Sequence, residues 1–151
     1  MSKEQQFFDA ARSGNLSVVK KLAADTTLNK NWQESSQGFT PFNQACYEGH
    51  MSVVQFLLTL PTVDVNKPKD SGATPFYIAC QEGHKEVVSL LLADPRVDTN
   101  KPDSFQCTPL FVFLAGRSPV SWSGHISLRK GNWHQDQVHC WHCCLEQQDR
   151  N

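Results

Sequence analysis

Two stretches of the chain share one pattern of hydrophobic and polar positions. The segments from about Met51 to Leu60 and from about Lys85 to Ala93 each contain the motif Val-Val-x-x-Leu-Leu. This spacing places the apolar side chains on one side of an α-helix, so it predicts two amphipathic helices. Pro61 and Pro95 follow these segments and are expected to close the helices. Each helix must then bury its apolar stripe against a neighbouring element.

A second pattern recurs between these helices. The tripeptides that begin at Thr40, Thr74 and Thr108 read Thr-Pro-Phe, Thr-Pro-Phe and Thr-Pro-Leu, and each begins 34 residues after the one before. A Thr hydroxyl can cap a helix, and Pro is tolerated at the first helical position. Three short helices are therefore predicted to begin at Pro41, Pro75 and Pro109. Gly49 and Gly83 would end the first two by supplying a positive backbone torsion.

The repeated unit resembles the ankyrin repeat, a turn followed by two antiparallel helices with a Thr-Pro-Leu-His-x-Ala motif and a later Gly-His. The copies 38–50 and 72–84 agree over nearly their whole length. Residues 8–15 match the end of the first helix and the glycine turn, shifted by one residue, and indicate an N-terminal capping repeat. The resemblance implies an all-α, ankyrin-type helix-turn-helix solenoid, which is stabilised by stacking of one repeat on the next. The expected organisation is a capping repeat, two full repeats, a truncated fourth repeat and an irregular C-terminal tail. The boundaries are a repeat array over residues 1–116, divided at about 4–36, 37–70, 71–104 and 105–116, and a disordered tail over 117–151.

The chain departs from the family pattern at two kinds of position. Asn43, Tyr77 and Phe111 occupy the place that is usually His, so the hydrogen bond from that His to the turn should be lost or replaced. Gln106 occupies the turn position that is Gly38 and Gly72 in the preceding copies. If this position requires a positive torsion, the fourth turn is strained.

Composition and charge narrow the function classes. The chain has 151 residues, 39% of them hydrophobic, and a formal net charge of −1, which gives no overall bias toward nucleic acid or membrane. The N-terminus has no apolar signal-peptide core, and no stretch approaches the length needed to span a bilayer. We therefore expect a monomer in the cytoplasm, with a nuclear location also compatible.

No set of residues recommends an enzyme. Cys46 and Cys80 occupy the same slot of successive repeats, where small hydrophobic side chains allow helices to approach, and neither has a His or Asp partner at a consistent spacing. His50 and His84 also repeat, which favours a structural role in the turn. No catalytic residue, cofactor site or metal site is predicted.

The resemblance implies instead a binding scaffold that uses its hairpin turns and the exposed side of its first helices. An exposed Phe39 beside Tyr47 would form an aromatic anchor for a protein partner. The alternative is that Phe39 packs across neighbouring turns and Tyr47 lies half buried on its helix. The variable positions predicted to contact the partner are Ser36, Gln37, Phe39, Tyr47, Glu48, Asp70, Ser71, Ala73, Gln81, Glu82, Ser104 and Phe105.

The residues after Leu114 have a different composition. They contain three of the four Trp, four of the six His and three of the six Cys, and no helical or alternating period. The Cys and His residues between His134 and Cys144 are competent zinc ligands, but they form one crowded cluster, whereas zinc modules place two separated pairs around a loop. A structural metal site is therefore not predicted. A nucleic-acid-binding tail is the related alternative, and weak charge density disfavours it.

A shifted reading frame is a further hypothesis for the tail. The third repeat predicts Glu-Gly-His at 116–118, where the chain has Gly116-Arg117-Ser118. One choice of codons for residues 116–121 is GGA AGG TCA CCT GTC AGT, and this choice, read one base later, gives Glu-Gly-His-Leu-Ser-Val. The repeats and the lack of a catalytic residue set together predict a non-catalytic protein-binding module. A truncated or frame-shifted product with impaired binding is the alternative. The partner itself is not identified by the sequence.

Overall fold

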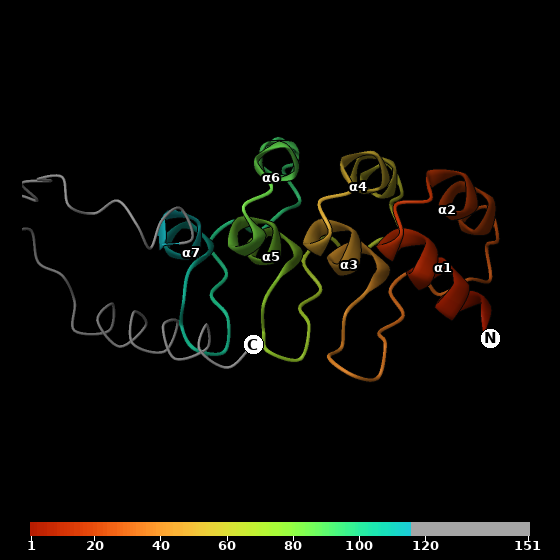
Figure 1. Ribbon diagram of the computed structural model, residues 1–151, viewed down its shortest axis with the longest axis horizontal. Helices are drawn as coiled ribbons and strands as arrows, with labels where there is room; N and C mark the ends of the chain where they lie inside the picture. Colours follow the sequence, from red (N-terminus) through yellow and green to blue (C-terminus); the bar gives the residue numbers. More distant parts are fainter. Residues whose placement is uncertain (116–151) are drawn as a thin grey trace, which may run out of the picture.

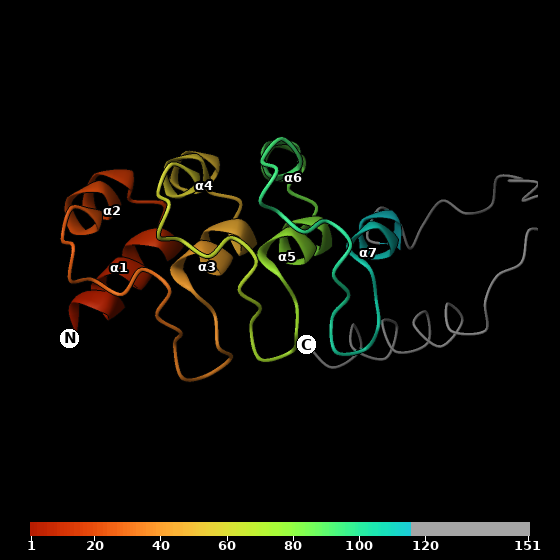
Figure 2. The ribbon, with the colours of Figure 1, turned by 180° about the vertical axis from the view of Figure 1, so that it is seen from behind.

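A computed structural model of the chain describes residues 1–115, which form seven α-helices and no β-strand. Figure 1 shows α1, α3, α5 and α7 side by side in one row and α2, α4 and α6 in a second row, with the connecting turns extending from the other side of the first row. Figure 2 shows the same order from behind. The predicted all-α, helix-turn-helix stack is confirmed. The helices are α1 Lys3–Arg12, α2 Leu16–Ala23, α3 Pro41–Tyr47, α4 Met51–Leu58, α5 Pro75–Glu82, α6 Lys85–Leu92 and α7 Pro109–Ala115.

The predictions for the C-terminal segment lie outside the described residues. These are the disordered tail over 117–151, the absence of a zinc site there, the nucleic-acid alternative and the shifted frame. The division into an array over 1–116 and a separate tail stays a prediction.

The first helices begin where the Thr-Pro motif predicts. Oγ1 of Thr40 accepts a hydrogen bond of 3.1 Å from the backbone amide of Asn43, and Thr74 caps α5 in the same way. The proline after each Thr is the first residue of its helix, where a backbone amide would have no acceptor within the helix. The second helices α4 and α6 end at Leu58 and Leu92, slightly earlier than predicted. Thr59 and Ala93 follow these helices as C-caps and still have right-handed helical torsions, so the difference concerns only the last turn of each helix.

The core lies between the two rows of helices. The first three members of each Val-Val-x-x-Leu-Leu stripe are buried there, as the motif predicts: Val53, Val54 and Leu57 in α4, and Val87, Val88 and Leu91 in α6. The last member differs, since Leu58 is only partly buried and Leu92 is exposed, so the predicted burial of Leu92 is wrong. Cys46 and Cys80 are free thiols in this core, on the first helices α3 and α5. Burial raises the pKa of the Cys46 thiol and raises that of Cys80 to about 11, so neither is a thiolate at neutral pH. Both fit the predicted role of small hydrophobic side chains.

The residue that follows the first proline of each helix is more exposed at the end of the stack than in the earlier repeats. Phe42 is 1% exposed and Phe76 is 6% exposed, but Leu110 is 65% exposed. Each first helix is covered by the hairpin that follows it, and α7 is the last helix that the structure describes. Burying a large apolar side chain contributes roughly 1.5–3 kcal/mol, so the fourth repeat lacks a contribution that its predecessors have.

The fourth turn has the strained backbone that its sequence predicts. Gln106 has φ of 64°, close to the 71° of Gly38 and the 81° of Gly72 at the equivalent positions. An L-residue in this region is destabilised by roughly 1–2 kcal/mol relative to its relaxed conformation. Within residues 1–115, Gln106 is the one non-glycine residue with a positive φ.

Candidate partner-binding surface

The turns between hairpins form a row of tips that hydrogen-bond to one another. The backbone amide of Asp70 donates to the carbonyl of Gln37 at 3.0 Å, and the amide of Ser104 donates to the carbonyl of Ser71 at 3.0 Å. These bonds connect the second turn to the third and the third to the fourth. The tips are therefore held in register and present one continuous surface (Figure 1).

A carboxylate organises the first of these tips. Glu34 accepts hydrogen bonds from the hydroxyl and amide of Ser36, both at 2.6 Å, and from the amides of Gln37 at 2.7 Å and Phe39 at 3.4 Å. Burial alone would raise the pKa of Glu34, but these donors outweigh it and lower the pKa to about 2. Glu34 is thus ionised at neutral pH and holds Ser36 and Gln37 in place.

Asp103 has the same role in the fourth turn. Its Oδ1 accepts bonds of 2.9 Å from the amides of Phe105 and Cys107, and its Oδ2 accepts a bond of 3.0 Å from the hydroxyl of Tyr77. Tyr77 occupies the position that is usually His, so a different side chain supplies the bond from helix to turn. At the equivalent position in α3, Asn43 is fully buried and neither polar atom of its side chain has a hydrogen-bond partner. The hydrogen bond that His usually makes to the turn is therefore replaced at Tyr77 and lost at Asn43.

The aromatic pair comes from the two ends of α3: Phe39 directly precedes the N-cap Thr40, and Tyr47 is the last residue of the helix. The rings of Phe39 and Tyr47 meet edge to face with centroids 5.7 Å apart, and Nζ of Lys69 lies 4.6 Å from the centroid of Phe39. Tyr47 is 40% exposed, but Phe39 is only 6% exposed. The prediction that Phe39 is exposed is wrong, because Tyr47, Lys69 and the neighbouring turn cover its ring. Phe39 lies beneath the surface, and Tyr47 is the exposed member of the pair.

Charged side chains surround this pair. Burial lowers the pKa of Lys69, although Glu82 and Asp70 act in the opposite direction. Burial also raises the pKa of Glu82, against the influence of His84, Gln81 and Lys69. Partly desolvated charges interact more strongly with an incoming group than charges in bulk water do. The surroundings of Tyr47 therefore combine an apolar body with charges of both signs.

The other predicted positions divide into exposed and buried. Ala73 is buried under the turn, so the prediction that it is accessible is wrong: the third turn folds its short side chain inward against Tyr77 and Ile78. Phe105, at the fourth tip, is 46% exposed. Ser71 is partly exposed, and the exposed positions are Ser36, Gln37, Glu48, Asp70, Gln81, Glu82 and Ser104.

The two repeated histidines link successive hairpins. Nε2 of His50 donates to the carbonyl of Arg12 at 2.9 Å, and Nε2 of His84 donates to the carbonyl of Tyr47 at 2.8 Å. Each ring therefore satisfies a carbonyl at the end of the preceding first helix. The repetition of Gly-His indicated a structural role, but the partner carbonyl lies in another repeat and could not be read from the sequence.

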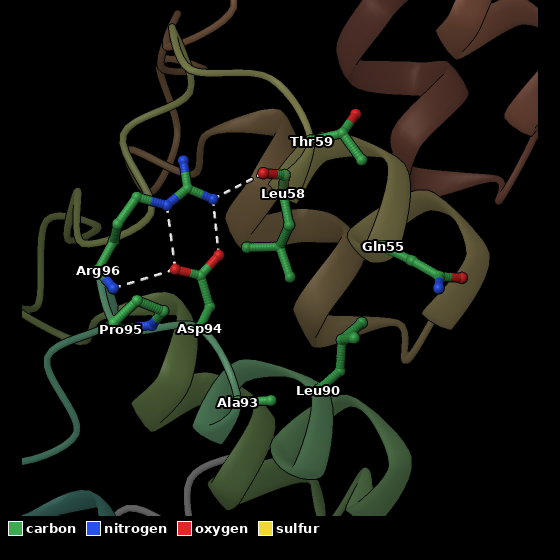
Figure 3. Close-up of a pocket in the computed structure, with 8 residues that line it drawn as sticks. All are labelled: Gln55, Leu58, Thr59, Leu90, Ala93, Asp94, Pro95 and Arg96. Carbon is green, nitrogen blue, oxygen red and sulfur yellow. Dashed lines mark hydrogen bonds and ion pairs between the residues drawn. The ribbon is translucent and has the colours of Figure 1, made fainter.

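An open cleft of about 480 Å³ lies between α4 and α6 (Figure 3). One repeat earlier, the position of Leu90 is Phe56, whose larger ring lies 5.7 Å from Nζ of Lys20 in the joint between α2 and α4. The charged groups of the cleft are paired with each other and with the backbone. Nη2 of Arg96 donates to the carboxylate of Asp94 and to the carbonyl of Leu58, both at 2.6 Å. The cleft therefore lies where Leu90 stands in place of the larger Phe56 of the preceding repeat. The lining residues are Gln55, Leu58, Thr59, Leu90, Ala93, Asp94, Pro95 and Arg96.

Within residues 1–115, no three His, Cys, Asp or Glu side chains are grouped closely enough to hold a metal ion. None of the helices in this part of the chain combines the length and apolar character that a membrane span requires.

A stack of short helical hairpins, joined by turns in register and linked by Gly-His pairs, defines a repeat protein of the solenoid class. The chain belongs to the ankyrin repeat family, because a family model of three ankyrin repeats matches residues 7–103. Ankyrin repeats generally mediate protein–protein interaction. The chain is also 40% identical over 63 residues to oxysterol-binding protein-related protein 1 from Homo sapiens, an alignment that covers 36% of this chain and 7% of that protein. The chain thus matches a small part of this relative's length.

Proposed function

We propose that this chain is a non-catalytic scaffold that binds a protein partner through its hairpin tips and the exposed side of its first helices. The observation that supports this most is the position of Tyr47, exposed at the end of α3 and held edge to face by a buried Phe39. A rigid aromatic side chain loses little entropy on binding, and such residues concentrate binding energy.

The tips extend this surface on both sides of Tyr47. Ser36 and Gln37 are fixed by Glu34, and Ser104 and Phe105 are fixed by Asp103 and the backbone bond to Ser71. Because these groups are ordered before binding, a partner meets a surface that needs little further ordering. We further propose that the chain acts as a monomer in the cytoplasm or nucleus. It would need no cofactor and would bind neither nucleic acid nor membrane.

Site-specific photocrosslinking tests where the partner binds. A photoreactive phenylalanine analogue is placed at Tyr47, at Phe105 or, as a control, at Met51, which is similarly exposed but lies on the second-helix row. We expect a protein adduct from cell extract with the first two variants and none with the third. Adducts only at Met51 would contradict the proposed surface.

Alanine variants give the matching affinity measurement once the adduct has been identified. Tyr47→Ala should weaken binding by at least tenfold, which corresponds to about 1.4 kcal/mol, and should lower the free energy of unfolding by only about 1 kcal/mol through the lost ring contact with Phe39. Phe39→Ala is not a clean test of contact, since its ring is buried and its removal should unfold part of the surface. Unchanged binding in the double variant Tyr47→Ala, Phe105→Ala would refute the proposal.

A further inference from the structure

Each hairpin of the stack places a histidine ring against a glycine of the hairpin before it. A Cβ atom added to Gly14 would lie 2.8 Å from Nδ1 of His50, and one added to Gly49 would lie 2.6 Å from Nδ1 of His84. Gly83 is the next glycine in this series and has the same backbone torsion, with φ of 74° against 73° for Gly49. Among residues 1–115, no heavy atom outside Gly83 and its immediate chain neighbours lies within 4 Å of the equivalent point at Gly83.

The connection after each hairpin contains an asparagine, and the last of these three asparagines also lacks a contact that the earlier two make. The side chain of Asn31 donates to the carbonyl of Thr62 at 2.8 Å and accepts from the amide of Asp64 at 2.8 Å. Asn66 repeats both bonds one repeat later, with Arg96 at 2.6 Å and Asp98 at 2.7 Å. Asn100 is the third member of this series, and its side chain has no such partner among residues 1–115.

Apolar side chains of the last repeat also lack contacts that their equivalents in earlier repeats make, as the glycine and asparagine of that repeat do. Leu58 of α4 is partly buried against the next hairpin, whereas Leu92, its equivalent in α6, is 58% exposed. Leu110 of α7 is exposed as well. We define the end face as Gly83, Leu92, Asn100 and Leu110. In the part of the chain that the structure describes, each of these residues lacks a contact that its equivalents in earlier repeats make.

We propose that the end face is the binding site of a further ankyrin second helix that begins with Gly-His, and that this helix is the one specified by the shifted reading frame of residues 116–121. The two earlier repeats show which chemistry covers such a face: an imidazole against the glycine and a backbone carbonyl and amide for the asparagine. One choice of codons for residues 116–121, read one base later, gives Glu-Gly-His at the position where the repeat places it, whereas the chain itself has Gly116-Arg117-Ser118. This inference concerns the end of the stack and is independent of the partner surface around Tyr47.

A graft into the full chain tests the inference. Residues 116–132 are replaced by a copy of 82–98, which supplies the Gly-His pair, the apolar stripe and the two backbone groups expected to meet Asn100. The grafted protein should have a midpoint of thermal unfolding at least roughly 5 °C above that of the parent. Amide exchange in α6 should slow by roughly tenfold or more, because the helix is covered on its second side.

Two controls separate specific binding from general stabilisation. The same graft with alanine in place of its histidine should lose much of the gain. Gly83→Ala introduces the same backbone strain in both backgrounds, but only in the graft would its methyl group meet a ring, so the substitution should destabilise the graft more than the parent. A graft that melts at or below the parent temperature, or equal effects of Gly83→Ala in both, would overturn the binding site.

Sequencing of the transcript tests the identity of the occupant. The codons of residues 116–121, read one base later, should give Glu-Gly-His followed by a helix with apolar residues at the repeat positions. Codons that give another sequence would overturn this assignment. A parent protein that forms dimers in solution through Leu92 and Leu110, detected by light scattering and lost in Leu92→Glu, would show a second copy as the occupant and would equally overturn it.

Discussion

Individual residues in this chain act chiefly by connecting one repeat to the next. His84 shields Gly49 and binds the carbonyl of Tyr47, and Asn66 bridges two backbone groups of the following connection. Glu34 works within its own turn, where one carboxylate accepts several backbone and hydroxyl donors. Each of these side chains replaces water at a backbone group that the helices and turns leave unpaired.

The two glycines that end α3 and α5 should differ in their response to alanine. Gly49→Ala and Gly83→Ala place a side chain at nearly the same positive φ, so backbone strain is common to both. Only Gly49→Ala pushes against the ring of His84, which also holds the bond to Tyr47. We expect Gly49→Ala to be more destabilising than Gly83→Ala by about 1–2 kcal/mol, measured by urea unfolding. Equal losses would show that the ring moves aside freely.

The stability contributed by Glu34 should depend on pH. Its pKa in the folded chain is about 2, below the ordinary 4.5, so its contribution is fully present above about pH 5 and is lost as the pH falls toward 2. At pH 7, Glu34→Gln should lower the free energy of unfolding by about 1 kcal/mol, a value reduced for partial exposure. The difference between wild type and variant should shrink toward zero at pH 2. A difference that is constant across this range would exclude the carboxylate as its source.

At the scale of elements, first and second helices depend on different neighbours. The first helices α3, α5 and α7 rest on one another and carry the tips, whereas α6 packs against α4 and α5 and has no later second helix beside it among the described residues. The connections between hairpins are held by the asparagine bridges rather than by regular secondary structure. Removing one bridge should therefore loosen the contact between two repeats.

Two asparagines at equivalent positions make this a matched comparison. Asn66→Ala removes bonds to Arg96 and Asp98 and should destabilise the chain by about 1–2 kcal/mol, since both backbone groups are exposed enough for water to replace part of the loss. Asn100→Ala should change the stability by no more than about 0.5 kcal/mol. Chemical unfolding of the two variants under one set of conditions decides this. A comparable loss from Asn100→Ala would mean that this side chain has a partner beyond the described residues.

The sequence predicted helix starts and strained torsions well because they depend on local chemistry. Thr before Pro fixes the start of α3 and α5, and Gln106 in a glycine slot predicted its positive φ. The burial of Ala73 was not predicted, and the burial of Phe39 was only one of two alternatives. Variation between repeats marks positions that differ, but exposure depends on how the next turn folds over them. The bridges of the histidines and asparagines were missed for the same reason, since their partners lie a whole repeat away.

At the scale of the molecule, stability should decrease along the stack toward α7. In a solenoid each repeat contacts only its neighbours, so a repeat covered on one side can open without the others. Phe42 and Phe76 are covered on both sides, and Leu110 is not. The fourth repeat also carries the strained Gln106. Opening of α7 and its turn should therefore require less free energy than opening of α3.

Native-state hydrogen exchange measures this gradient directly. We expect the amides of α3 to exchange only through global unfolding, with a strong dependence on urea, and those of α7 to exchange through a local opening with little dependence on urea. Protection in α5 and α6 should lie between the two. Gln106→Gly should slow exchange in α7 by relieving the torsion, although glycine also raises the entropy of the unfolded chain and limits the effect to a few-fold. Equal protection in α3 and α7 would mean that the described helices unfold as one cooperative unit despite the exposure of Leu110.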